Sequence, residues 1–129
     1  MPKTAEDVEN YLLQLDRRYD NDAGTYLVTS GADSPPIAIR VLPPIVAVRV
    51  AIGPVPEDTA SQVKLFRRLL EYNATDLMHA SYGLENSVII LTAALELDNL
   101  DKNELEATLS DMDLALARHV PVLRDASQA

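Results

Sequence analysis

The sequence contains no cysteine and no tryptophan, and it has one phenylalanine and four glycines among 129 residues. Without cysteine the chain forms no disulfide and offers no thiolate ligand to a metal ion. With so few glycines there is no glycine-rich loop of the kind that binds phosphates, and no Gly-x-Ser-x-Gly motif marks a serine nucleophile. These absences exclude a disulfide-stabilised fold and several common classes of enzyme.

Long hydrophobic runs are absent as well. The longest apolar stretch without a charge, residues 87–95, is too short to cross a bilayer as a helix. Glu6 and Asp7 stand where a signal peptide has its apolar segment. We therefore expect a cytoplasmic protein without a membrane partner.

Negative charge is what the chain has in excess. Its 11 basic and 20 acidic residues give a net charge of −9, which disfavours nucleic acid and anionic lipid as partners. The one basic cluster, formed by Lys64, Arg67 and Arg68, is too small to indicate a nucleic-acid site. The charge either serves solubility or favours a protein partner with a basic segment.

Hydrophobic periodicity predicts an α+β fold in the order α-β-β-β-α-β-β-α. Apolar residues recur every three or four positions in three segments, which predicts helices over residues 4–19, 58–73 and from 101 to a stop or bend near 119–120, before Pro121. Alternating patterns predict strands over residues 25–30, 37–42, 45–52, 79–84 and 87–97. We expect one domain spanning residues 1–129, with its core in about 4–123. It should form an antiparallel five-stranded sheet with helices packed on one face.

Candidate catalytic and metal-binding residues are few. His79 and His119 lie far apart in the sequence, and neither has a partner at ligand spacing. Residues 98–104 resemble a calcium loop but lack its glycine, and they are better explained as the start of a helix. Asp111 and Asp113, two positions apart on a helix, point in different directions and indicate a solvated acidic face. We predict no catalytic residue, no metal and no cofactor. A deep pocket that holds a histidine beside a carboxylate would overturn this prediction.

From residue 59 onward the pattern resembles a known family. A leucine-rich helix ends in Tyr72-Asn73, a hairpin follows over residues 82–91, and residues 95–101 lead into an amphipathic helix. This pattern resembles the type III secretion chaperones of the CesT/Tir-chaperone type. It is equally similar to the related YbjN-type domains. The resemblance covers about residues 59–123, and the preceding elements agree in their order.

The resemblance implies a dimeric, non-enzymatic fold that binds polypeptides. Carried over by position, it places the dimer interface on Val63, Phe66, Leu69, Leu70 and Tyr72. It places the partner-binding residues at Leu12, Leu15, Ile39, Val41 and Val48. Three amphipathic helices also predict more apolar surface than one copy of the chain covers.

Two functions remain open at this point. The first is a chaperone-like adaptor that holds a segment of a partner polypeptide as a homodimer. The second is a regulatory or scaffolding domain of the YbjN type that docks on a folded partner. In both cases the partner is a protein, and the chain performs no reaction.

Overall fold

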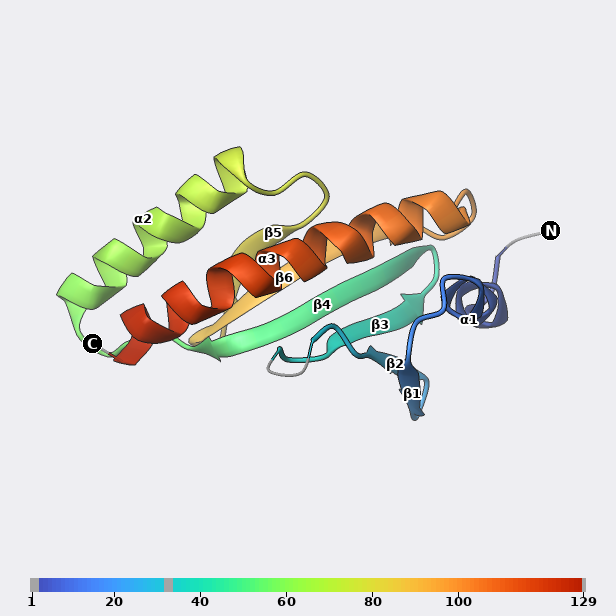
Figure 1. Cartoon of the computed structure of the whole chain (residues 1–129), viewed down its shortest axis with the longest axis horizontal. Coiled ribbons are helices and arrows are strands. Elements are labelled where there is room, and N and C mark those ends of the chain that lie inside the picture. The colour runs from blue at the N-terminus through green and yellow to red at the C-terminus, as the bar shows by residue number, and fades with distance from the viewer. Residues whose placement is uncertain (1–2, 32–33, 129) are drawn as a thin grey trace.

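The computed structural model describes residues 3–31 and 34–128 and shows helices packed on an antiparallel sheet (Figure 1). The elements are, in chain order, α1 (Ala5–Gln14), β1 (Tyr19–Asp22), β2 (Thr25–Val28), β3 (Ile37–Leu42), β4 (Ile45–Pro54), α2 (Thr59–Thr75), β5 (Ser81–Glu85), β6 (Val88–Glu96) and α3 (Lys102–Gln128). The sheet has six strands in the order β1-β2-β3-β4-β6-β5. The α+β fold with an antiparallel sheet is confirmed, whereas the predicted count of five strands is wrong.

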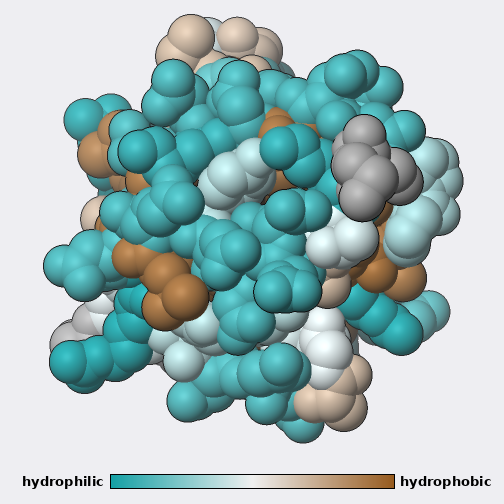
Figure 2. Space-filling view, turned by 90° about the vertical axis from the view of Figure 1, so that its right-hand side faces the viewer, coloured by the Kyte–Doolittle hydropathy of each residue, from teal (hydrophilic) through white to brown (hydrophobic). Residues whose placement is uncertain are grey.

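The long helix α3 crosses the sheet diagonally, with α1 near one end of the molecule and α2 near the other (Figure 1). The end that carries α1 presents mainly hydrophilic residues, with apolar ones scattered among them (Figure 2). Within the described residues, no helix is long and apolar enough to cross a membrane.

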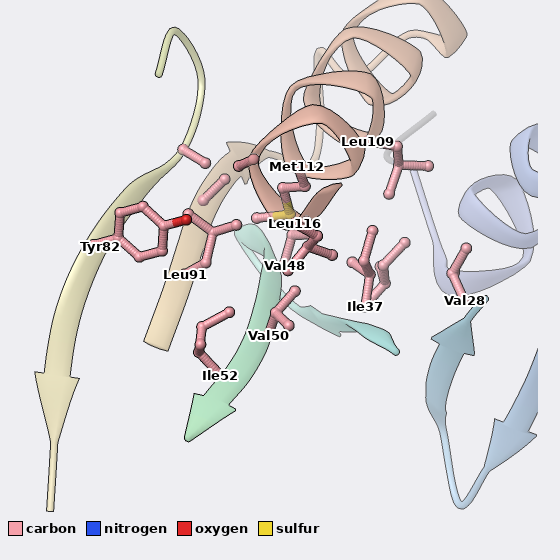
Figure 3. Packing of buried hydrophobic residues seen from close by; sticks show 14 of the residues in the cluster. Val28, Ile37, Val48, Val50, Ile52, Tyr82, Leu91, Leu109, Met112 and Leu116 are labelled. Atoms are coloured by element: carbon pink, nitrogen blue, oxygen red, sulfur yellow. The ribbon is translucent and has the colours of Figure 1, made fainter. Parts of the chain in front are cut away.

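The hydrophobic core lies between α3 and one face of the sheet. Val48 and Val50 of β4 point toward Met112 and Leu116 of α3, and all four are buried (Figure 3). On the opposite face of the sheet, Arg40 of β3 and Arg49 of β4 are exposed. Alternate residues of these two strands are therefore buried and exposed, because successive side chains in a strand point to opposite faces.

The first helix is shorter than predicted, and a strand replaces its end. α1 stops at Gln14, and Tyr19 begins β1 and pairs with Val28 of β2. Ala23 and Gly24 form the turn of this hairpin with φ values of 51° and 93°, as the common two-residue hairpin turn requires. Tyr19 fits the helical spacing of the apolar residues in α1, but the turn at Ala23 and Gly24 places it in a strand.

The last helix continues through Pro121, where a bend or stop was expected. Proline lacks the N–H that would bond to the carbonyl four residues earlier, here that of Ala117. Both Pro121 and Ala117 are exposed, so this carbonyl is open to water. At the other end of α3, the Asp101 carboxylate accepts the N–H of Glu104 at 2.7 Å and so caps the helix, in agreement with the prediction that a helix starts within residues 98–104.

Candidate functional site

Helix α2 carries apolar residues on two faces. Leu65 and Leu69 are buried against the body of the protein. Val63 and Leu70 are 60% and 68% exposed, and Phe66 between them is half-buried. Residues three and four apart share a helix face, so these three residues form a continuous outward stripe. Together with Ala74 they line a shallow groove, and we call these four residues the α2 strip.

The structure divides the five predicted interface residues into two groups. Val63, Phe66 and Leu70 belong to the α2 strip, whereas Leu69 is 5% exposed and lies in the core. Tyr72 is half-buried: its ring stacks on a histidine, and it also lines a groove beside Lys64 and Arg68. The five residues therefore do not share one surface, because Leu69 lies in the core and Tyr72 lies outside the α2 strip. The dimer interface itself stays a prediction. Leu65, which sequence reasoning missed, stands four residues before Leu69 and marks the true inward stripe.

The α2 strip continues onto the neighbouring strand. A second groove runs between α2 and β5, and its lining includes Phe66, Leu70, Gly83 and Leu84. Leu84 is 48% exposed. The apolar surface therefore extends from the helix to the edge strand of the sheet, and a partner of α2 would also contact β5.

The residues predicted to bind a partner lie mostly inside the protein. Leu12, Ile39 and Val48 have no exposed surface and belong to the core. Leu15 and Val41 are half-buried and pack against that core. Leu12, Ile39 and Val48 are therefore not part of a partner-binding surface in this conformation. Their alternating and helical spacing is explained by packing alone.

Beneath the α2 strip, His119 of α3 joins three elements. Its Nδ1 lies 2.8 Å from the Tyr82 hydroxyl of β5, and its Nε2 lies 2.9 Å from a carboxylate oxygen of Asp76 at the end of α2. Its ring stacks on Tyr72 of α2, with centroids 3.6 Å apart and planes 5° apart. We call His119, Tyr82 and Asp76 the histidine cluster. It fastens α2 and β5 to α3.

The histidine cluster has a histidine beside a carboxylate, the arrangement that would reopen the question of an enzyme. His119 is only 3% exposed, however, and it lines none of the grooves described on this chain. Burial, followed by the nearby Tyr72 and Asp76, raises the pKa of Tyr82 above its ordinary value. Its hydroxyl is therefore a poor nucleophile. The hydrogen bond from His119, followed by that from Thr75, lowers the pKa of Asp76.

Other candidates for chemistry are dispersed. His79 is exposed. No group of three or more metal-binding side chains is gathered anywhere in residues 3–31 and 34–128. The basic residues Lys64, Arg67 and Arg68 line a groove on α2, where Arg67 pairs with Glu71 at 3.2 Å. These positions form a charged border beside the α2 strip.

The two edge strands of the sheet differ in whether a side chain forms hydrogen bonds with their outward backbone groups. At the β5 edge, the Asn73 side chain of α2 bonds both backbone groups of Tyr82: its Oδ1 accepts the N–H at 2.7 Å, and its Nδ2 donates to the carbonyl at 3.1 Å. In an antiparallel strand, alternate residues direct their backbone groups outward, so Leu84 is the next outward residue. An added strand at β5 would have to displace the Asn73 amide.

At the β1 edge, no side chain takes this role among the described residues. Asp22 pairs with Thr25 across the two-residue turn, and the Arg18 carbonyl accepts the N–H of Thr29. The outward backbone groups are therefore those of Tyr19 and Asn21. Asp20 and Asp22 beside them are exposed. This edge is short and acidic, so an extended segment that pairs with it would need basic side chains.

Comparison with solved structures shows a shared fold. A chain in the ExoU–SpcU complex of the Pseudomonas aeruginosa type III secretion system superposes with a TM-score of 0.71 at 19% identity, covering 90% of this chain and 97% of that chain. YbjN from E. coli gives 0.64 at 9% identity, covering 88% and 91%. The Yersinia pestis chaperone SycH, solved with a fragment of YscM2, gives 0.59 at 13% identity, covering 88% and 99%. Among curated protein sequences, none matches this chain.

The order of elements and the helix-covered sheet thus define the class: an α+β domain with the fold of type III secretion chaperones and of YbjN. Within that class, the model of the CesT_Tir_1 family matches residues 1–129. The chain belongs to this family, and the resemblance stated from its sequence is confirmed.

Proposed function

We propose that the protein is a non-enzymatic, cytoplasmic adaptor that forms a homodimer through the α2 strip and holds a segment of a partner polypeptide. The observation that carries the proposal is the second apolar face of α2. Val63 and Leu70 are exposed although Leu65 and Leu69 already fasten the same helix to the core. An apolar face that the chain itself does not cover favours a protein partner.

The arrangement of the strip supports pairing with a second copy. Val63 and Leu70 lie at equal distances along α2 from a midpoint between Phe66 and Arg67. In an antiparallel pair of α2 helices related by a twofold axis, Val63 of one copy would face Leu70 of the other. Charged residues at the border of the strip, such as Arg67 and Glu71, would lie at the rim of the contact, where ion pairs are compatible with solvent.

The partner segment is proposed to bind in extended form at the β1 edge. Tyr19 and Asn21 offer outward backbone groups, and Asp20 and Asp22 favour lysine or arginine at alternate positions of the segment. The β5 edge is a poorer acceptor, because the Asn73 amide occupies the backbone of Tyr82.

Light scattering of matched variants tests the dimer. The wild type is expected to have twice the mass of one chain, and Leu70→Asp or Val63→Asp is expected to give monomers, because each would bury an unpaired carboxylate in the contact. Leu13→Asp is the control, since Leu13 is 61% exposed on α1, outside the strip. A monomeric wild type, or dissociation by all three variants alike, would contradict the interface.

A second candidate function follows from the similarity to YbjN, whose fold this chain shares at a TM-score of 0.64. In that case the protein would dock on a folded partner as a regulatory or scaffolding domain. Crosslinking in cells, followed by limited proteolysis of the captured complex, separates the two functions. A held segment belongs to a partner region that proteases cut when it is free, whereas a docked domain resists cleavage with or without the adaptor.

A further inference from the structure

The atoms around His119 determine which of its nitrogens carries a proton. An ionised carboxylate only accepts hydrogen bonds, so Nε2 must carry the hydrogen that points to Asp76. In a neutral imidazole the other nitrogen is then bare, and Nδ1 accepts the hydroxyl hydrogen of Tyr82. In this state every buried side-chain polar atom of the described residues has a partner. Neutral His119 therefore completes the network.

Protonation of His119 reverses one of these two bonds. Nδ1 would carry a hydrogen and become a donor, so the Tyr82 oxygen would have to accept. The hydroxyl hydrogen of Tyr82 would then need a new acceptor, because its partner among the described residues is His119 Nδ1. A buried donor without a partner is costly. The hydrogen bond from Nε2 to Asp76 keeps its direction and becomes an ion pair, because the imidazolium is positive and the carboxylate is negative.

The charged and titratable groups around His119 act in opposite senses. From α2, Asp76 favours an imidazolium, and the face of Tyr72 tolerates one. From β5, Tyr82 opposes it for the reason just given. On α3 itself, Arg118 opposes a second positive charge beside Asp76, whereas Asp111 is close enough to act on Tyr82. Protonation of His119 therefore weakens its contact with β5 and keeps its contact with α2.

We propose that the histidine cluster is a proton-sensitive latch: neutral His119 holds β5 on α3 through Tyr82, and protonation at Nδ1 releases β5 while Asp76 keeps the end of α2 in place. Histidine is the side chain whose ordinary titration falls between pH 5 and 8. Tyr82 also lines the groove between α2 and β5, so the latch controls the shape of that groove. The latch does not depend on the proposed function, because its contacts lie within one copy of the chain.

The test is an NMR titration of both histidine rings in the intact protein. In Tyr82→Phe, which removes the hydroxyl and keeps the ring, the midpoint of the His119 titration is expected to move to higher pH. In Asp76→Asn it is expected to move to lower pH. His79, which is exposed and is not one of the three residues of the histidine cluster, is the reference in the same sample and should keep its midpoint in all three proteins.

Hydrogen exchange at Gly83 reports the release of β5, since its N–H points toward β6. Its protection factor, corrected for the intrinsic effect of pH, should fall several-fold as His119 of the wild type becomes protonated. In Tyr82→Phe it should be low at every pH. A His119 midpoint unmoved by Tyr82→Phe would overturn the latch, as would a Gly83 protection factor independent of the His119 titration. If Tyr82→Phe does not fold, the wild-type exchange measurement decides alone. Neither measurement depends on whether the protein is a dimer. The latch and the proposed homodimer can therefore fail independently.

Discussion

Two aspartates on α3, Asp111 and Asp113, show how much single residues contribute to this fold. The Asp111 carboxylate accepts the backbone N–H groups of Met78, His79 and Ala80, with the shortest distance 2.8 Å to His79. It thereby fixes the connection between α2 and β5. Asp113 accepts from Arg17, which follows α1, and from the hydroxyl of Ser30, each at 2.6 Å.

Replacement of Asp111 should destabilise the protein although the residue is only partly buried. In Asp111→Ala three backbone donors lose their shared acceptor, and we expect the free energy of unfolding to fall by about 1 to 2 kcal/mol. Urea denaturation measures this change. Glu106→Ala is the control, since Glu106 is exposed on the same helix and should change the value little. Equal effects of the two substitutions would argue against this role of the Asp111 carboxylate.

Asp76 should make the stability depend on pH in the acid range. Its pKa is lowered in the folded protein, chiefly by the hydrogen bond from His119, so folding favours its ionised form. The resulting stabilisation is present above about pH 4, the ordinary value for aspartate, and is lost as the pH falls through the lowered value of the folded state. In Asp76→Asn the loss of stability below about pH 4 should be smaller than in the wild type.

Urea denaturation at several pH values measures this difference. Asp98→Asn serves as the control, because Asp98 is exposed and should leave the acid dependence as it is. Parallel pH profiles for the wild type and Asp76→Asn would contradict the role of the Asp76 carboxylate.

The two aspartates also show where sequence reasoning ends at the scale of residues. Their spacing of two correctly implies that they point in different directions, and the conclusion drawn from it, a solvated acidic face, is wrong. Each carboxylate bonds a segment that is distant in the sequence, and no local pattern identifies such a partner. The bonds of Asn73 to Tyr82 escape prediction for the same reason.

Among the elements, those governed by strict alternation were predicted best. β3 and β4 begin at the predicted residues, because alternation with a period of two identifies a strand directly. α2 was placed correctly along the chain, but its inward and outward apolar residues were not separated. Leu65 with Leu69 and Val63 with Phe66 and Leu70 both satisfy helical spacing, and only tertiary packing decides between them. β1 was missed because Tyr19 fits the spacing of α1.

The hairpin of β1 and β2 depends on the backbone of Gly24. Its φ of 93° is disfavoured for any residue with a Cβ atom, although no atom lies within 4 Å of the position that the Cβ would take. Gly24→Ala should therefore lower the free energy of unfolding by about 1 kcal/mol. Gly53→Ala is the matched control, since Gly53 also has open space around it and lacks a positive φ. Thermal unfolding compares the two, and equal losses would refute the argument from φ.

On the scale of the whole molecule, the apolar strip on α2 and the acidic edge at β1 are separated. The net charge is −9, yet Lys64, Arg67 and Arg68 border the apolar strip on α2, and acidic Asp20 and Asp22 stand at the opposite edge of the sheet. Two surfaces of different chemistry thus lie at the two ends of the molecule. The proposed dimer contact and the proposed contact with a polypeptide segment would therefore use separate surfaces and could form at the same time.

A labelled peptide with alternating lysine and valine tests the acidic edge. Its affinity should fall as salt is added, because exposed charges are screened, and it should fall several-fold in the double variant Asp20→Asn/Asp22→Asn. The double variant Asp98→Asn/Glu106→Gln removes the same charge elsewhere on the surface. Fluorescence anisotropy measures both, and equal weakening would mean that the peptide senses net charge alone.

The amide of Asn73 limits how two copies of this protein could meet at the β5 edge. Because a side chain already fills the place that a neighbouring strand would take beside Tyr82, two copies that meet at α2 cannot merge their sheets into one continuous ladder. Contact between them is left to side chains, which a single twofold axis can satisfy. In the proposed dimer the β5 edge would therefore give no template for a further strand beside Tyr82.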